Sequence, residues 1–303
     1  MRWTTEQLPD LSGRRALVTG ANSGIGFVTA REFARHGAQV VLAVRDTDAG
    51  DAAAERIRRA GIRGDVSVEP LDLASLESVR SLAGRFEGTL DVLVNNAGVM
   101  APPRRRTTVD GHELQFGTNH LGHVALTALL LPHLLKSESP RVTTVSSLAH
   151  RGGDRRVLAG NTEQGYDPQT SYAQSKLANL LFALELQRRA DAAGSQLTST
   201  AAHPGVSSTR LFTSRDGMGA NGVVRAILGG FGKVFFAGPD AAAEAVLFAA
   251  TVAEPGSYTG PTSLGGARGA IGPALPSGWA TDETLAGLLW DRSEQLAGVH
   301  LTF

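Results

Sequence analysis

Tyr172 and Lys176 are the residues whose types and spacing most clearly could do chemistry. They lie four positions apart in Y-A-Q-S-K, so a helix would place both side chains on one face. The chain has only three tyrosines and three lysines, and this spacing rarely arises by chance. At about 5 Å and an effective dielectric near 20, an ammonium group favours a phenolate by about 3 kcal/mol, or about two pKa units. We expect Lys176 to lower the pKa of Tyr172 toward the range of a general acid/base; an exposed pair on an amphipathic helix is the alternative.

A glycine-rich segment follows the first predicted strand, Arg15 to Gly20. The strand ends in T-G-A-N-S-G-I-G, which contains Gly20, Gly24 and Gly26, and a helix is expected from about Gly24. Glycine permits positive φ and lets backbone amides approach a pyrophosphate closely. A helix N-terminus next to that turn favours negative charge. The segment therefore predicts a dinucleotide-binding turn, with a plain strand-to-helix turn as the alternative.

The end of the second predicted strand bears on which nucleotide binds. L-A-V-R-D places Arg45 where an acidic residue would bind the ribose 2′-hydroxyl of NAD. A guanidinium group suits a 2′-phosphate far better than a hydroxyl. Asp46 could pair with Arg45 or begin the next helix as its N-cap, and Arg45 could be a solvated surface charge. We expect the cofactor to be NADP(H), with NAD(H) as the weaker alternative.

Apolar strands alternate with helices along the chain. Strands are expected at 15–20, 38–44, 65–73, 91–98, 141–147 and 197–205, and helices at 24–37, 46–60, 75–86 and 171–193, with a further long helix around Asn119 and a last strand and helix near Tyr258 and Trp290. Strands without polar alternation that are joined by helices are typical of a doubly wound parallel sheet. The prediction is an α/β fold: one Rossmann-like domain over residues 1–303 with helices on both faces of the sheet.

Composition excludes several classes of function. The 29 basic and 29 acidic residues cancel, which disfavours binding to nucleic acid or to an anionic membrane surface. The absence of cysteine excludes thiol nucleophiles, disulfides, iron–sulfur clusters and cysteine-bound zinc, and the eight histidines show no metal-binding spacing. No apolar run could span a bilayer and residues 1–13 lack an apolar signal core, so we expect a cytoplasmic protein. Arg104–Arg106 is interpreted as a solvated loop.

Five motifs occur in the order and approximate spacing of the short-chain dehydrogenase/reductase family, which the chain resembles from about Leu11 to Leu264. They are T-G-A-N-S-G-I-G, N-N-A-G at 95–98, the serine pair at 146–147, Y-A-Q-S-K and H-P-G-V at 203–206. L-A-V-R-D, G-H-E-L-Q-F-G-T-N-H-L-G-H at 111–123 and S-S-L-A-H at 146–150 look like the retinol-dehydrogenase-like branch.

The resemblance implies four catalytic residues. Tyr172 would exchange a proton with the substrate oxygen, and Lys176 would hold the nicotinamide ribose. Ser147 would hydrogen-bond the substrate carbonyl, and Asn119 would position a water in a proton relay to Lys176. Taken singly, Asn119 could be an ordinary helix residue and Ser147 a strand-end cap.

The resemblance also implies a cofactor-binding set. Asp72 would contact the adenine amino group, although an aspartate at a strand end can also cap the next helix; Asn95 and Gly98 would lie on the adenosine-ribose side and Thr209 at the diphosphate or carboxamide. The full set is Gly20, Asn22, Ser23, Gly24, Ile25, Gly26, Arg45, Asp72, Leu73, Asn95, Ala97, Gly98, Tyr172, Lys176, Pro204, Gly205, Val206 and Thr209.

Two irregular segments, 149–170 and 207–239, are expected on the substrate side of the site, where open α/β sheets bind ligands. The first makes the stretch between Ser147 and Tyr172 about twice as long as in many family members. The retinol-dehydrogenase-like branch also has a longer segment here. The second combines glycines with apolar side chains, among them Leu211, Phe212 and Phe231, and predicts a lid over an apolar substrate. A helix that buries its own apolar stripe or meets another subunit is the alternative.

These observations together predict an NADP(H)-dependent oxidoreductase that interconverts an apolar alcohol and its aldehyde or ketone by hydride transfer. Family habit suggests a homodimer or homotetramer. A catalytically silent NADP(H)-binding sensor or scaffold of the same fold is the alternative, disfavoured because the catalytic set is present. An epimerase or dehydratase of the extended family fits neither the glycine spacing nor the length of the C-terminal part.

Overall fold

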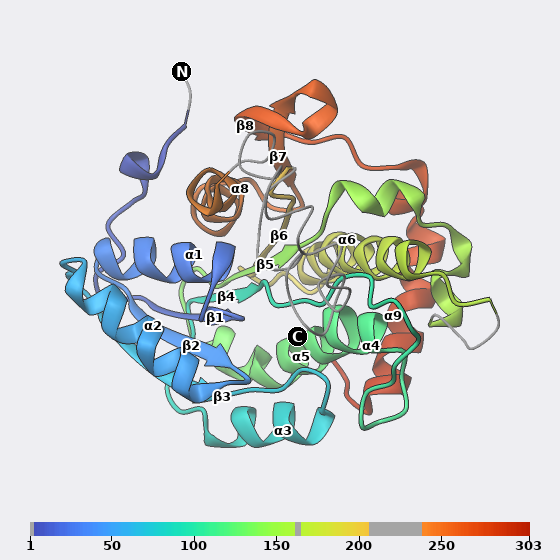
Figure 1. The fold of residues 1–303 in the computed structure, drawn as a ribbon, viewed down its shortest axis with the longest axis horizontal. Helices are drawn as coiled ribbons and strands as arrows, with labels where there is room; N and C mark the ends of the chain where they lie inside the picture. The colour runs from blue at the N-terminus through green and yellow to red at the C-terminus, as the bar shows by residue number, and fades with distance from the viewer. Residues whose placement is uncertain (1–2, 161–164, 206–237) are drawn as a thin grey trace.

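One eight-stranded sheet organises the molecule (Figure 1), in a computed structural model that describes residues 3–160, 165–205 and 238–303. The strand order is β3-β2-β1-β4-β5-β6-β7-β8. The strands are β1 (Arg15–Thr19), β2 (Gln39–Val44), β3 (Asp65–Pro70), β4 (Val92–Asn95), β5 (Arg141–Val145), β6 (Thr198–Ala202), β7 (Tyr258–Ser263) and β8 (Arg268–Pro273). Neighbouring strands are parallel as far as β7, and β8 is antiparallel to β7. The predicted fold class is confirmed, with β8 as an antiparallel strand that the sequence pattern did not predict.

Helices cover both faces of the sheet. They are α1 (Gly24–Arg35), α2 (Thr47–Arg59), α3 (Leu76–Arg85), α4 (Leu114–Phe116), α5 (Gly122–Leu134), α6 (Pro168–Ala192), α8 (Pro239–Thr251) and α9 (Glu283–Ala297). Phe33 of α1, Ile57 of α2 and Val246 of α8 belong to one apolar cluster. The second cluster joins the opposite face of the sheet to α3, α5, α6 and α9, through Leu82, Phe182 and other side chains. Figure 1 shows the two layers on either side of the strands.

The topology creates one crevice at the carboxyl ends of the central strands. From β1 the chain turns to one side, to β2 and β3, and then returns to the other side of β1 as β4. Connections that leave in opposite directions cannot fill the space above β1 and β4, which is where open α/β sheets bind ligands. Thr19 ends β1, Asn95 ends β4 and Val145 ends β5, so the segments that follow these residues surround the crevice.

The helix expected around Asn119 is interrupted. Between α4 and α5 lies a π-helix, η2 (Gly117–Leu121), in which the Gly122 N–H donates to the Gly117 carbonyl five residues earlier. Such turns hold one residue more than an α-helix and recur at functional sites. Asn119, at the centre of η2, is completely buried.

The helix that carries Tyr172 begins three residues before its predicted start at Ser171. Asp167 caps α6 by accepting a hydrogen bond from the Thr170 N–H at 2.7 Å, and Pro168 occupies the first turn, where its missing N–H costs nothing. Two short 3-10 helices, η3 (Leu148–Gly152) and η4 (Arg155–Ala159), precede it in the segment expected to be irregular. Among the helices of the described residues, none combines the length and apolar character needed to cross a membrane.

Candidate active site

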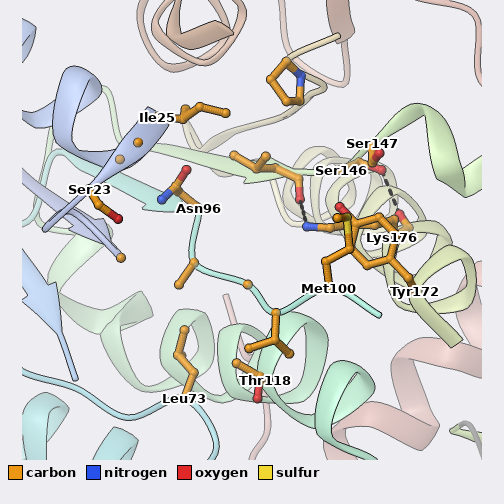
Figure 2. Close-up of a pocket in the computed structure, with 18 of the residues that line it drawn as sticks. Ser23, Ile25, Leu73, Asn96, Met100, Thr118, Ser146, Ser147, Tyr172 and Lys176 are labelled. Atoms are coloured by element: carbon orange, nitrogen blue, oxygen red, sulfur yellow. Dashed lines mark hydrogen bonds between the residues drawn. The ribbon is translucent and has the colours of Figure 1, made fainter. Parts of the chain in front are cut away.

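A cavity of about 620 Å³ occupies the crevice at the carboxyl ends of the strands (Figure 2). Ser23 and Ile25 lie at one end, Tyr172 and Lys176 at the other, and Asn96 between them. Most of the residues predicted from the sequence line it: Gly20, Asn22, Ser23, Gly24, Ile25, Gly26, Arg45, Asp72, Leu73, Ala97, Gly98, Ser147, Tyr172, Lys176, Pro204 and Gly205. One cavity therefore joins the glycine loop to the Tyr172–Lys176 pair, as a dinucleotide site requires.

The glycine loop packs tightly against the end of β4. A Cβ atom on Gly26 would lie 2.5 Å from Asn96 Nδ2 and 2.6 Å from the carbonyl oxygen of Gly20, closer than such atoms approach in proteins. Gly20 has a φ of +67°, in the left-handed region that favours glycine. The side chain of Asn96 donates to the Thr19 carbonyl at 2.7 Å and ties the loop to the strand beside it. Glycine is therefore required at Gly26 by close approach and at Gly20 by backbone conformation.

The N-terminus of α1 opens toward the cavity without a side-chain cap. Ser23 occupies the N-cap position and makes no capping hydrogen bond. By contrast, side chains cap α2, α3, α6 and α9. The first-turn amides of α1, together with the partial positive charge of the helix, suit the phosphate groups of a dinucleotide.

The residues expected to bind the adenosine half of the cofactor also line the cavity. Arg45 is exposed and lines the cavity directly after β2. Asp46 accepts from the Ala49 N–H at 3.0 Å and so acts as the N-cap of α2. Asp72 lines the cavity and its Oδ1 accepts from the Ala74 N–H at 2.9 Å. Ser75, not Asp72, caps α3.

Tyr172 and Lys176 lie together on the cavity wall, one turn apart on α6. Tyr172 is 7% exposed and Lys176 3% exposed, and the Lys176 ammonium lies 5.8 Å from the centroid of the tyrosine ring. The ammonium donates to the Val145 carbonyl at 3.0 Å. The predicted juxtaposition of the two side chains on one helical face is present.

Burial dominates the proton affinities of this pair. It raises the pKa of Tyr172 to about 12, partly offset by hydrogen bonding to the Ser147 side chain, and lowers the pKa of Lys176 to about 8. The expected lowering of the Tyr172 pKa is therefore wrong for the protein alone, because removal of the phenolate from water raises the pKa more than the hydrogen bond with Ser147 lowers it. At neutral pH Tyr172 is a phenol that can donate a proton.

Ser147 and Asn119 occupy different positions relative to the cavity. Ser147 follows β5, lines the cavity, and its Oγ accepts from the Ala149 N–H at 3.2 Å, so the cap predicted as its alternative role coexists with a place at the site. Asn119 lies behind the wall. Its Oδ1 accepts from the Val99 N–H at 2.7 Å, and its Nδ2 donates to the Val99 carbonyl and to Ser175 Oγ, each at 3.0 Å. A Cβ on Gly98 would come within 3.0 Å of this amide, so Asn119 shapes the wall from behind.

Asn95 does not belong to the cavity wall. It was expected on the adenosine-ribose side, but it is fully buried and its Nδ2 donates to Thr127 Oγ1 at 3.0 Å. Because side chains alternate along a strand, the next residue, Asn96, faces the cavity instead. Val206 and Thr209 lie outside the described residues, as does nearly all of the segment 207–239 expected to form a lid.

Several lining residues were not assigned to the site from the sequence. Met100 packs against Tyr172, with Ala149 beside them. Thr118 and Gln169 also line the cavity. The signal for Gln169 and Ala149 was the irregular segment 149–170, which was expected on the substrate side, and the signal for Thr118 was its place in the motif at 111–123 next to Asn119; Met100 carried no comparable signal. In the part of the chain that the structure describes, no group of three acidic or histidine side chains could hold a metal ion.

Comparison with known proteins agrees with this geometry. The sequence model of the family described as short chain dehydrogenase matches residues 14–218. Human "Retinol dehydrogenase 13" is 40% identical over 294 residues, covering 95% of this chain and 86% of that protein.

Two solved structures are similar over most of the chain. An uncharacterized protein from Mycobacterium paratuberculosis has a TM-score of 0.83 at 44% identity, with 100% of both chains covered. The NADP complex of Pseudomonas aeruginosa RhlG has a TM-score of 0.62 at 26% identity, covering 82% of this chain and 94% of that one. With the glycine loop, the Tyr172–Lys176 pair and the doubly wound sheet, these similarities show that the chain belongs to the short-chain dehydrogenase family, is retinol-dehydrogenase-like, and is an oxidoreductase of alcohol and carbonyl groups.

Proposed function

We propose that this protein is an NADP(H)-dependent reductase of apolar aldehydes or ketones in which Tyr172 supplies the proton. The observation that carries the proposal is the convergence of Tyr172, Lys176 and Ser147 at one end of a cavity whose other end is the glycine loop. The bound nicotinamide cofactor would supply or accept a hydride at its C4. The chain must then hold the cofactor, orient the substrate and move one proton.

The residues at the catalytic end divide that work. Ser147 and Tyr172 present their hydroxyl groups to the same substrate oxygen, Ser147 to orient it and Tyr172 to donate a proton as negative charge develops there. The raised pKa of Tyr172 keeps the phenol protonated at neutral pH, which favours the reductive direction. Oxidation requires the phenolate, so its rate should rise with pH across the alkaline range. Lys176 would hold ribose hydroxyls and would stabilise the phenolate that the donated proton leaves behind.

The substrate end is apolar, which supports an apolar substrate. Met100 and Ala149 pack around Tyr172, and Leu148 lines the cavity next to Ser147. The human relative is named for retinol, an apolar alcohol. A panel of carbonyl compounds should show larger kcat/KM for long apolar aldehydes and ketones than for small charged ones; the reverse order would contradict this part of the proposal.

Arg45 supports the preference for NADPH. Its position after β2 suits a 2′-phosphate, and the P. aeruginosa structure is described with NADP. Arg45→Ala should raise the dissociation constant for NADPH about tenfold, the loss of one charged hydrogen bond, and leave that for NADH unchanged. Nicotinamide fluorescence measures both constants. An equal loss of affinity for NADH would mean that Arg45 does not bind the 2′-phosphate.

Tyr172→Phe tests the proposed function directly. The variant should lose about 100- to 10,000-fold in kcat, the range for a general acid, and keep its affinity for NADPH. Tyr166→Phe is the matched control, because Tyr166 is only partly buried and its hydroxyl donates to the Pro102 carbonyl. Retention of turnover in Tyr172→Phe would refute the assignment.

A further inference from the structure

Two sequence motifs that the proposed function leaves unexplained each end in a buried histidine. His123 ends G-H-E-L-Q-F-G-T-N-H-L-G-H and His150 ends S-S-L-A-H. They are 1% and 0% exposed, and neither lines the cavity. Each follows a residue of the proposed catalytic set by about one helical turn: His123 follows Asn119, and His150 follows Ser147.

His123 joins the π-helix to the end of β1. Its Nδ1 lies 2.9 Å from the main-chain carbonyl of Asn119, and its Nε2 lies 2.9 Å from Thr19 Oγ1. Thr19 Oγ1 in turn accepts from the N–H groups of Asn96 and Ala97, each at 2.9 Å. One chain of contacts therefore runs from the cavity wall after β4, through β1, to the backbone of Asn119.

The positions of the protons in this chain follow from its partners. A carbonyl only accepts, so Nδ1 of His123 carries the hydrogen. The Thr19 hydroxyl accepts from two N–H groups, and its own hydrogen faces two acceptors, the Val94 carbonyl at 3.3 Å and Nε2 of His123 at 2.9 Å. With Nδ1 protonated, Nε2 of the neutral ring accepts, and the shorter contact receives the threonine hydrogen. His123 is then a neutral ring protonated at Nδ1, in agreement with burial and the nearby Lys176 charge, which lower its pKa to about 4.

His150 has the same arrangement behind Ser147. Its Nδ1 lies 2.7 Å from the Ser147 carbonyl, and its Nε2 accepts from the Ser277 N–H at 3.1 Å. Ser277 belongs to the segment between β8 and α9, far away in the sequence. The ring is again neutral and protonated at Nδ1, because Nε2 accepts and the nearer partner of Nδ1 is a carbonyl. It packs edge-on against Tyr258 with ring centroids 5.4 Å apart, and the tyrosine hydroxyl lies 3.4 Å from Nδ1.

We propose that His123 and His150 are positioning residues that hold the backbone of Asn119 and Ser147 through their Nδ1 hydrogens. Each ring ties one residue of the proposed catalytic set to an element distant in sequence, β1 for Asn119 and the segment before α9 for Ser147. Asn119 holds both backbone groups of Val99, so a shift of η2 would move the cavity wall. A shift at Ser147 would move its hydroxyl directly. This role rests on the proposed function, since it acts through Ser147 and Asn119.

Substituting each histidine by leucine and by asparagine distinguishes the effect of losing the hydrogen bond from the effect of losing side-chain volume. Leucine fills most of the ring volume without polar atoms, whereas asparagine places an N–H near the position of Nδ1. His123→Leu and His150→Leu should each lower kcat about 10- to 100-fold, the cost of misplacing a reacting group by about 1 Å, with the NADPH dissociation constant within about threefold of the wild-type value. The asparagine variants keep this N–H donor but not the Nε2 contact to Thr19 or Ser277, so they should recover only part of kcat. His133→Leu is the control: its Nδ1 also contacts a carbonyl, that of Gly88, outside the cavity lining, and its loss should leave kcat unchanged.

Nitrogen NMR of the histidine rings provides a readout that does not depend on turnover. The signals that disappear in His123→Asn and His150→Asn should be those of neutral, Nδ1-protonated rings that do not titrate between pH 6 and 8. His203 is an internal contrast, because its Nδ1 accepts from the Gly205 N–H and its ring must carry the hydrogen on Nε2.

The two measurements keep the inference distinct from the proposed function. Nε2-protonated or titrating rings at His123 and His150 would overturn the positioning role even in a fully active enzyme, as would folded leucine variants with wild-type kcat. Should a leucine variant fail to fold, its asparagine counterpart and the NMR signals decide. If the wild-type protein turns over no carbonyl compound, the proposed function fails, and the NMR signals alone decide whether the rings hold the backbone as described.

Discussion

The two ends of the cavity are built from different chemical groups. At the nucleotide end the main chain of the loop from Gly20 to Gly26 and the uncapped start of α1 form much of the wall. At the catalytic end the wall and the layer behind it consist of buried side chains whose polar atoms are held by hydrogen bonds, Lys176 in the wall and Asn119 behind it. The nucleotide end should therefore be sensitive to added atoms, and the catalytic end to lost partners or to charge, because unpaired buried polar groups are costly.

The groups at the two ends also differ in how they affect the stability of the fold. A glycine that permits a close approach serves both binding and folding, since the same contact holds the loop against β4. A lysine buried in its charged form opposes folding, although the chemistry needs it. Substitutions at the two ends should accordingly change stability in opposite directions, and three experiments can break or sharpen this contrast.

Lys176→Met should have the largest effect. Burial lowers the pKa of Lys176 from its ordinary 10.5 to about 8, so between these values the unfolded chain holds a proton that the folded chain has lost. The free energy of unfolding therefore rises with pH across this window, and the full cost of the buried charge is present below pH 8. Methionine removes this cost, about 3 kcal/mol, and Asn179 still donates to the Val145 carbonyl at 3.1 Å. The variant should be more stable than wild type below pH 8 and nearly inactive.

Denaturant unfolding at pH 7 and pH 9.5 measures this effect. The stability difference between Lys176→Met and wild type should shrink toward the higher pH. Lys136→Met, at an exposed lysine, serves as the control and should show no such dependence. A Lys176→Met protein less stable than wild type at pH 7 would mean that the ammonium contributes to folding rather than opposing it.

Gly26→Ala should have the next largest effect. The new methyl group must displace Asn96 or the Gly20 carbonyl, which destabilises the protein by about 1–3 kcal/mol and should weaken NADPH binding about tenfold. Gly84→Ala is the matched control, because Gly84 also lies in a helix, α3, and has nothing within 4 Å of its added Cβ. That variant should gain about 0.5–1 kcal/mol from helix propensity. Thermal unfolding and fluorescence titration compare the two, and equal behaviour would contradict a backbone-built nucleotide end.

Asp46→Ala should have the smallest effect. It removes the hydrogen bond to the Ala49 N–H and should cost about 1 kcal/mol of stability. Asp46→Asn keeps an acceptor at the same place and should cost only a fraction of that. If both variants lose the same amount of stability, the negative charge rather than the cap supports the start of α2.

The outline of the fold and the glycine loop were predictable because both depend on local patterns. Buried apolar runs joined by helices imply a parallel sheet, and T-G-A-N-S-G-I-G after the first of them implies the loop. The choice between Asn95 and Asn96 was not predictable, because it depends on which face of the sheet each side chain meets, and both are asparagines. The antiparallel β8 depends on pairing with β7 after a short turn, where the strand pattern is weak.

The electrostatics of the catalytic pair required the structure. The four-residue spacing correctly brought Tyr172 and Lys176 together on α6, but spacing carries no information on how deeply a helical face is buried. With both side chains under 10% exposed, removal from water changes both pKa values more than the two groups change each other's. The role proposed for His123 and His150 could not be predicted from the sequence either, because it depends on partners such as Thr19 and Ser277 that lie far away in the sequence.

The π-helix η2 also makes the catalytic end sensitive to chain length, not only to side-chain identity. A π turn holds about one residue more than an α turn, so η2 accommodates an extra residue between α4 and α5. Deleting a single residue from Gly117–Leu121 would let the segment become regular α-helix, and residues beside the deletion would turn by about 100° around the axis, the advance of one residue. Asn119 would then lose its position against Val99 even though no functional side chain had been changed. The position of Asn119 is thus encoded by the number of residues in the turn, and a one-residue deletion would damage the site more than most point substitutions there.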